Sequence, residues 1–140
     1  MVEMLSAADP AELRRWLVQR LDESAPGRIQ LVTGPRQVGK TTILLELAAR
    51  YGTHGLYAAA DAPEAGVSGY WERFWGTAET LAREGKTVVL LDEIHLLPEW
   101  AAALKGYWDR FRRGRLPIHI VATGSSALRV TEGSRESLAG

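Results

Sequence analysis

The chain has 140 residues, enough for one compact domain, and its 46% hydrophobic and 24% charged residues are typical of a folded globular protein. Lysine and arginine (17) balance aspartate and glutamate (17), so the formal net charge is zero. The chain therefore has no overall positive charge that would attract nucleic acid or an anionic membrane. Because the chain has no cysteine, disulfides, thiolate catalysis and cysteine-bound metal sites are excluded.

The beginning of the chain predicts a cytoplasmic protein. Residues 1–4 are mixed and acidic and lack the basic segment and apolar core of a secretory signal. The longest apolar runs fall far short of the roughly 20 residues that a membrane span needs. We therefore expect no membrane partner.

The first predicted elements are a helix and a strand. Asp9 and Pro10 have the residue types of a helix N-cap and first helical position. Apolar residues at helical spacing follow, and the pattern ends at residues 24–27 with Ser-Ala-Pro-Gly. Residues 29–33 form a short β-branched run that predicts a buried strand.

The rest of the chain alternates between helical and strand patterns. The expected helices are 39–51, 69–83 and 98–113, and the expected strands are 55–60, 87–91 and 118–123. This alternation predicts an α/β fold with a mainly parallel sheet. We expect an N-terminal helix and linker at 1–27, packed on a core at 28–140. The polar tail suggests that this core is incomplete at residue 140, before a fifth strand.

The segment Gly34–Thr41 reads GPRQVGKT and matches the phosphate-binding pattern GxxxxGK(S/T). Its glycines let backbone N–H groups converge on phosphate oxygens at the start of a helix. Lys40 is expected to bind the β- and γ-phosphates and take part in catalysis, and the Thr41 hydroxyl to bind Mg²⁺. The nucleotide-binding residues expected are Gly34, Pro35, Arg36, Gln37, Val38, Gly39, Lys40, Thr41 and Thr42.

Two carboxylates, Asp92 and Glu93, follow the apolar strand 87–91. The C-terminal ends of parallel strands share one edge of the sheet, so this pair is expected beside the phosphate loop. Asp92 would hold Mg²⁺ together with Thr41, and Glu93 would act as the general base toward water. ATP is the expected nucleotide, because the guanine-reading NKxD motif is absent.

A cluster of hydroxyl groups follows the strand 118–123. In the three-layer P-loop NTPase fold (RecA/AAA-like), the expected order of the four strands is 1-4-3-2, which puts the fourth between the first and the third. Its tip would lie between the phosphate loop and the acidic pair. Thr123 is the first candidate for a catalytic hydroxyl there, and Ser125 is the second.

The segments GPRQVGKTT, LLDEIH and TGSSAL, together with the tail ESLAG, resemble a family of prokaryotic AAA-domain P-loop ATPases. The resemblance extends from about residue 29 to residue 140. It implies an ATP-dependent machine or switch, a homo-oligomer through the ATP site, an unidentified protein partner and a C-terminal domain of unknown role. It also makes Arg36 a feature of the nucleotide loop and Asp61 a family position. Arg129 and Arg135 are the in-chain candidates for an arginine that completes a neighbouring site.

Other functions stay open at this point. The string Asp92-Glu93-Ile94-His95 spells DExH, which is typical of a helicase fragment, although the zero net charge does not support a nucleic-acid partner. A nucleotide-binding switch that does not hydrolyse ATP, or a small-molecule kinase, needs Asp92 but not Glu93. The presence of Glu93 therefore favours hydrolysis.

Overall fold

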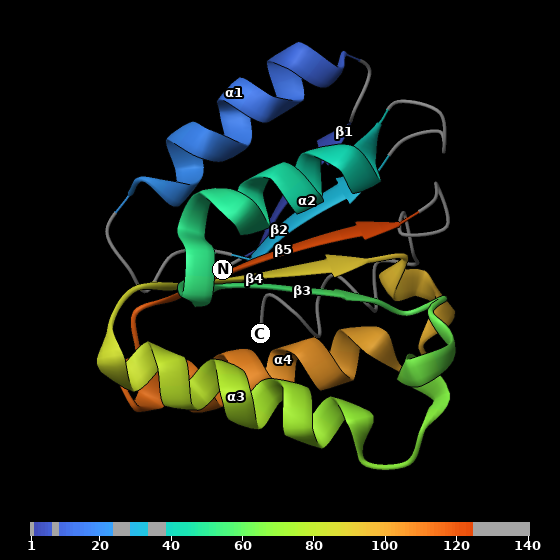
Figure 1. Ribbon diagram of the computed structural model, residues 1–140, viewed down its shortest axis with the longest axis vertical. Helices are drawn as coiled ribbons and strands as arrows, with labels where there is room; N and C mark the ends of the chain where they lie inside the picture. The colour runs from blue at the N-terminus through green and yellow to red at the C-terminus, as the bar shows by residue number, and fades with distance from the viewer. Residues whose placement is uncertain (1, 7–8, 24–28, 34–38, 125–140) are drawn as a thin grey trace.

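Residues 2–6, 9–23, 29–33 and 39–124 are described by the computed structural model (Figure 1). In chain order, the elements are β1 (Val2–Ser6), α1 (Pro10–Leu21), β2 (Ile29–Thr33), α2 (Lys40–Tyr51), η2 (Gly52–His54), β3 (Gly55–Ala59), η3 (Pro63–Gly66), α3 (Tyr70–Glu84), β4 (Thr87–Asp92), η4 (Ile94–Leu96), α4 (Trp100–Arg113) and β5 (Ile118–Gly124). The alternation of helices and strands that the sequence predicts is confirmed.

The strands form one parallel sheet in the order β1-β2-β5-β4-β3. The expected order 1-4-3-2 was wrong because it lacked one edge strand. Its strands 1 to 4 correspond to β2, β3, β4 and β5 of the structure. The missing strand is β1, which pairs with β2 from Val2 opposite Ile29 to Ser6 opposite Thr33. The segment 1–27 therefore contains a strand as well as the expected helix, while its division from 28–140 as a domain stays a prediction. The expectation of an incomplete C-terminal end concerns residues outside those described.

Helices cover both faces of the sheet and give three layers (Figure 1). The first face is buried under α1 and α2, where Leu17, Leu44 and Leu90 belong to one apolar cluster. The second face is buried under α3 and α4, where Leu91 and Phe111 belong to the other. Adjacent residues of β4 thus point into different clusters, and all six residues of this strand are buried. A strand buried on both faces explains its unbroken apolar sequence.

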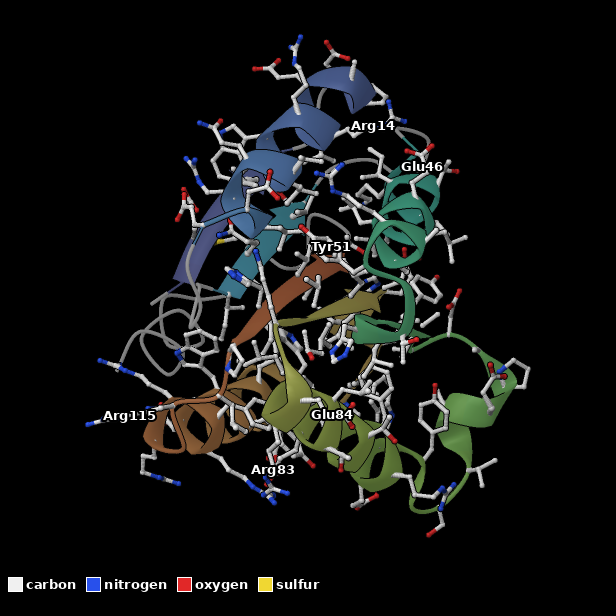
Figure 2. The ribbon with its side chains drawn as sticks, turned by 60° about the vertical axis from the view of Figure 1, so that its left-hand side comes forward. Arg14, Glu46, Tyr51, Arg83, Glu84 and Arg115 are labelled. Carbon is white, nitrogen blue, oxygen red and sulfur yellow. The ribbon has the colours of Figure 1, made fainter. Side chains whose placement is uncertain are left out.

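Helix α1 is fixed at its start by a side-chain cap and along its length by packing. Asp9 caps α1 through a 3.0 Å hydrogen bond that its carboxylate accepts from the backbone N–H of Ala11. On the outside of the same layer, Arg14 of α1 and Glu46 of α2 form an exposed ion pair at 2.7 Å (Figure 2). Exposed pairs of this kind contribute at most about 1 kcal/mol, so the buried leucines are what hold α1 in place.

None of the helices in the described part of the chain is long and apolar enough to cross a membrane.

Candidate functional site

The candidate site lies at the edge of the sheet where the parallel strands end. Asp92 is the last residue of β4 and Gly124 is the last residue of β5. Because Leu91 is paired with Ala122, the following residues, Asp92 and Thr123, lie side by side. The N-terminus of α2 begins at the same edge with Lys40 (Figure 1).

The carboxylate of Asp92 is the centre of the site. It is 3% exposed and accepts hydrogen bonds from hydroxyl groups on three different elements. Thr41 of α2 and Tyr57 of β3 donate to Oδ2 at 2.6 Å and 2.8 Å, and Thr123 of β5 donates to Oδ1 at 2.6 Å. Three charge-assisted bonds hold this carboxylate in one orientation.

Lys40 lies beside this carboxylate network at the first position of α2. Its side chain is buried, and its Nζ donates a 2.8 Å hydrogen bond to the backbone carbonyl of Gly124. Gly39 precedes it with φ of 79°, a left-handed conformation that suits glycine. No side chain caps α2 and its first turn contains no acidic residue. The N-terminus of α2 therefore presents a buried ammonium and a helix dipole to an anion.

Glu93 continues from Asp92 with an unusual backbone. Its φ of 56° is left-handed, which is uncommon for a residue other than glycine and turns the chain sharply out of β4. Its backbone N–H lies 3.4 Å from the Thr123 hydroxyl oxygen, and its Oε2 lies 3.4 Å from Nε2 of His95. The same Thr123 hydroxyl thus contacts both acidic residues, and His95 contacts the carboxylate of Glu93.

Tyr57 is the part of the site that sequence reasoning missed. Its hydroxyl is a donor to Asp92, and burial together with the carboxylate raises the pKa of this phenol well above its usual range. The phenol therefore stays protonated, and able to donate, across neutral pH. The sequence alone does not single it out: in β3, Tyr57 is paired with Leu90, and only this register puts it on the same sheet face as Asp92, two residues further along β4.

The structure brings together several of the residues that the sequence singles out. Thr41 and Thr123 both donate hydrogen bonds to Asp92, and Glu93 adjoins this group. Lys40 binds the carbonyl of Gly124, the residue after Thr123. Thr42 lies exposed in the first turn of α2, and Asp61 is exposed beyond the end of β3. The predictions for Gly34, Pro35, Arg36, Gln37, Val38, Ser125, Arg129 and Arg135 fall outside the described residues.

The residues present fit a Mg²⁺ ion bound with a nucleotide. Mg²⁺ prefers oxygen ligands and is held in such sites by one or two protein oxygens, with phosphates and water completing its coordination. The Thr41 hydroxyl and the Asp92 carboxylate supply oxygens of this kind, and they are already in contact at 2.6 Å. The ammonium of Lys40 lies at the same edge to balance phosphate charge.

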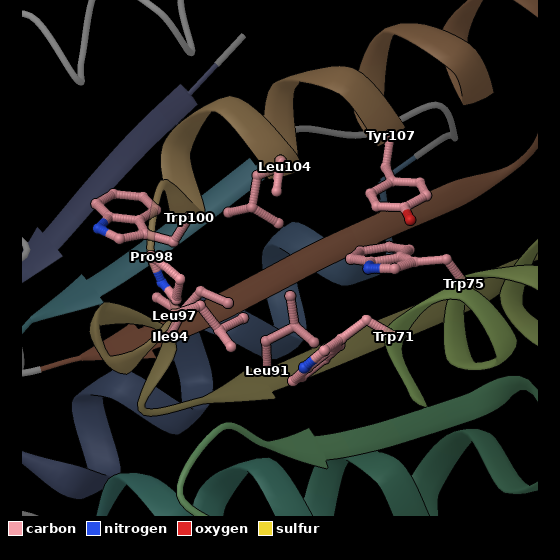
Figure 3. Close-up of a pocket in the computed structure, with 10 residues that line it drawn as sticks. Trp71, Trp75, Leu91, Ile94, Leu97, Pro98, Trp100, Leu104 and Tyr107 are labelled. Atoms are coloured by element: carbon pink, nitrogen blue, oxygen red, sulfur yellow. The ribbon is translucent and has the colours of Figure 1, made fainter. Parts of the chain in front are cut away.

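An apolar pocket of about 270 Å³ lies on the opposite face of β4, between the sheet, α3 and α4 (Figure 3). Its lining includes Leu91 and Ile94, the two residues that flank Asp92 and Glu93 in the sequence. Aromatic side chains form much of the rest of the lining: Trp71, Trp75, Trp100 and Tyr107. The backbone of the acidic pair is therefore fixed on both sides by residues that reach into the α3–α4 layer.

Comparison with known proteins identifies the family of the chain. A search of curated proteins and a search of solved structures found no match. A protein-family model described as an AAA domain matches residues 26–140, which include β2, α2, β4 and β5. This match confirms the AAA-type domain that the sequence motifs predict. The chain therefore belongs to the AAA domain family.

Proposed function

We propose that this chain binds ATP together with Mg²⁺ and hydrolyses it. The observation that carries the proposal is the contact of Thr41 with Asp92 beside Lys40, at the N-terminus of α2 and the C-terminal edge of the sheet. These are the hydroxyl, carboxylate and ammonium that bind magnesium and phosphate in P-loop enzymes. Membership of the AAA domain family supports the same conclusion.

The binding part of the reaction rests on Lys40, Thr41 and Asp92. Lys40 attracts the β- and γ-phosphates at the positive end of α2. The Thr41 oxygen would bind Mg²⁺ while its hydroxyl donates a hydrogen bond to Asp92, and residues 34–39 would supply the backbone donors of the loop. Held by Thr41 and Asp92, a Mg²⁺ ion would supply positive charge that offsets the charge of the phosphates.

The hydrolytic part rests on Glu93. Its carboxylate accepts a proton from water as the water oxygen forms a bond to the γ-phosphorus. The bond from that phosphorus to the β–γ bridging oxygen breaks, and ADP and phosphate leave. Thr123 positions the two acidic residues, because its hydroxyl donates a hydrogen bond to Asp92 and its oxygen accepts one from the backbone N–H of Glu93. Nε2 of His95 lies 3.4 Å from Oε2 of the Glu93 carboxylate.

The partners stay proposals of the same kind. We propose that hydrolysis acts on a protein partner and that a second copy of the chain binds beside the ATP site, as the family resemblance implies. An arginine supplied by the second copy would stabilise the transition state, and its absence would make the isolated chain slow.

Two substitutions test the proposed function. Glu93→Gln keeps the size of the side chain but removes its basicity, so ATP binding should persist while phosphate release falls by at least about a hundredfold. Lys40→Ala should weaken ATP binding, measured by calorimetry, because it removes the buried phosphate-facing ammonium. Glu99→Gln is a matched control for the first variant, since Glu99 also has a left-handed backbone (φ 55°) but is exposed.

The outcomes separate the alternatives. Equal phosphate release by wild type and Glu93→Gln would reject the assignment of the base. Unchanged ATP affinity in Lys40→Ala would reject the phosphate site. Transfer of phosphate to an added acceptor that survives Glu93→Gln would identify a kinase instead of a hydrolase.

A further inference from the structure

Tyr57 reaches the site from the edge strand β3. The register of the sheet pairs Tyr57 with Leu90, and Ala59 with Asp92, so the phenol spans diagonally from one strand to the next. Its hydroxyl ends 2.8 Å from Oδ2 of Asp92. The backbone continues this connection, because the N–H of Ala60 donates a 2.9 Å hydrogen bond to the carbonyl of Asp92. The end of β3 is thus bound to Asp92 through both side chain and main chain.

The hydrogen bonds on Asp92 leave its carboxylate little freedom. A carboxylate has about four lone-pair positions, two on each oxygen. Among the described residues, Thr41 and Tyr57 fill both positions on Oδ2, and Thr123 fills one on Oδ1. The remaining lone-pair position is therefore on Oδ1. Oδ2 would influence a metal ion indirectly, by orienting the Thr41 hydroxyl that binds the ion.

Without the Tyr57 hydroxyl, one position on Oδ2 would open. The carboxylate could then rotate toward a cation and pull away from Thr41, or bind water in place of the phenol. Either change would loosen the contact between Thr41 and Asp92, which prepares the Thr41 oxygen for Mg²⁺. Groups that orient metal ligands in this way typically change metal affinity by about 10- to 100-fold.

We propose that Tyr57 is a positioning residue for magnesium: its hydroxyl fixes Asp92 so that the carboxylate holds Mg²⁺ through the Thr41 hydroxyl and water. The inference rests on the proposed binding of ATP with Mg²⁺. It extends that function by giving an edge strand, outside the phosphate loop and the acidic pair, control over metal affinity. Tyr57 does not contact the reacting atoms.

The test is the effect of Mg²⁺ on ATP affinity, measured by calorimetry with Mg²⁺ and with a chelator. The ratio of the two dissociation constants is the magnesium enhancement. Tyr57→Phe keeps the ring that packs against the apolar cluster under α1 and α2, and removes only the hydroxyl. We expect the enhancement to fall about tenfold, while ATP affinity in the chelator and the thermal midpoint stay unchanged.

Tyr51→Phe is the matched control. Tyr51, labelled in Figure 2, also packs against the apolar cluster under α1 and α2. It is the last residue of α2, at the opposite end of the helix from Lys40. The same loss of a phenolic oxygen there should leave the magnesium enhancement as it is in the wild type. A second control places Tyr57→Phe in an Asp92→Asn background, where the tyrosine should have no further effect because it acts through the carboxylate.

Three results would contradict the proposed role of Tyr57 or of the metal site. An equal magnesium enhancement in wild type and Tyr57→Phe would overturn the role of Tyr57 and leave the proposed function standing. A loss of ATP affinity in the chelator as well would overturn it too, because the effect would then not be specific to the metal. A wild-type protein that binds ATP with no magnesium enhancement would instead reject the metal site itself.

Discussion

The hydroxyl of Thr41 donates a 2.6 Å hydrogen bond to Oδ2 of Asp92, although 51 positions separate the two residues in the sequence. The contact joins the first turn of α2 to the end of β4. It therefore makes the geometry of the proposed metal site depend on how α2 packs against the sheet.

The chemistry of position 41 can be tested with two substitutions. Thr41→Ser keeps the hydroxyl, and we expect ATP binding in Mg²⁺ to stay close to that of the wild type. Thr41→Val keeps the branched shape but removes the hydroxyl, so affinity in Mg²⁺ should fall by about 10- to 100-fold. Calorimetry in Mg²⁺ measures both. Equal affinities for the serine and valine variants would show that the hydroxyl is not a metal ligand.

Replacing two glycines with alanine should change the stability of the protein in opposite directions. A Cβ atom at Gly55, at the start of β3, would collide with the backbone carbonyl oxygen of Ala48 in α2, which has no side-chain freedom to move away. Gly55→Ala should therefore destabilise the protein by about 1–3 kcal/mol. Gly76 lies exposed within α3 with no atom within 4 Å of an added Cβ. Gly76→Ala should stabilise by about 0.5–1 kcal/mol.

Denaturant unfolding of both glycine variants gives the comparison. A Gly55→Ala protein as stable as the wild type would mean that α2 and β3 separate at little cost. That result would contradict the close approach of the two elements.

Phe111 should be among the most sensitive positions in the core. It is fully buried in α4, and its ring packs against Trp75 and Tyr107 at centroid distances of 5.8 Å and 6.3 Å. Phe111→Ala should reduce the free energy of unfolding by about 3–5 kcal/mol. Leu96→Ala is the control, because Leu96 is 49% exposed and should cost less than about 0.5 kcal/mol. Similar losses for both variants would contradict this placement of the core.

The stability of the protein should fall in acid because of His119. This histidine is buried in β5, and its burial, with the nearby positive charge of Lys86, lowers the pKa of its imidazole, while Glu23 acts in the opposite direction. The unfolded chain thus binds a proton more readily than the folded one. The stabilisation is complete above the unfolded pKa of about 6.5 and is lost as the pH falls toward the lower folded value.

The variant His119→Leu isolates this effect. It has no imidazole to protonate, so its free energy of unfolding should decline less than that of the wild type between neutral pH and about pH 5. Urea unfolding at several pH values measures the two slopes. Parallel slopes would exclude His119 as a source of acid sensitivity.

The sequence predicts those site residues that can be recognised from their immediate neighbours in the chain. Lys40 and Thr41 follow a glycine at the start of a helix, and Asp92 follows a fully buried strand, so strand-to-helix alternation alone brings their elements to one edge. Tyr57 could not be assigned in this way. An aromatic residue in a strand is usually a core residue, and only its register against β4 shows that it reaches Asp92.

The edge strand β1 escaped prediction for a related reason. Its five residues, VEMLS, have no strong strand pattern, and their conformation depends on pairing with β2 about 27 positions later. The start of α4 also differs from expectation: the helix begins at Trp100 and not at Pro98, because the 3₁₀ turn Ile94–Leu96 and the left-handed Glu99 come first. Both differences arise from tertiary contacts and backbone turns that composition does not encode.

The aromatic lining of the α3–α4 pocket gives the protein a built-in optical probe. Of the five tryptophans in the chain, Trp71, Trp75 and Trp100 line that pocket and Trp108 belongs to the same apolar cluster. Their indoles share this layer with Leu91 and Ile94, the immediate neighbours of Asp92 and Glu93. A movement of the acidic pair during nucleotide turnover should therefore change intrinsic fluorescence, so that the cycle can be followed in real time without attaching a dye.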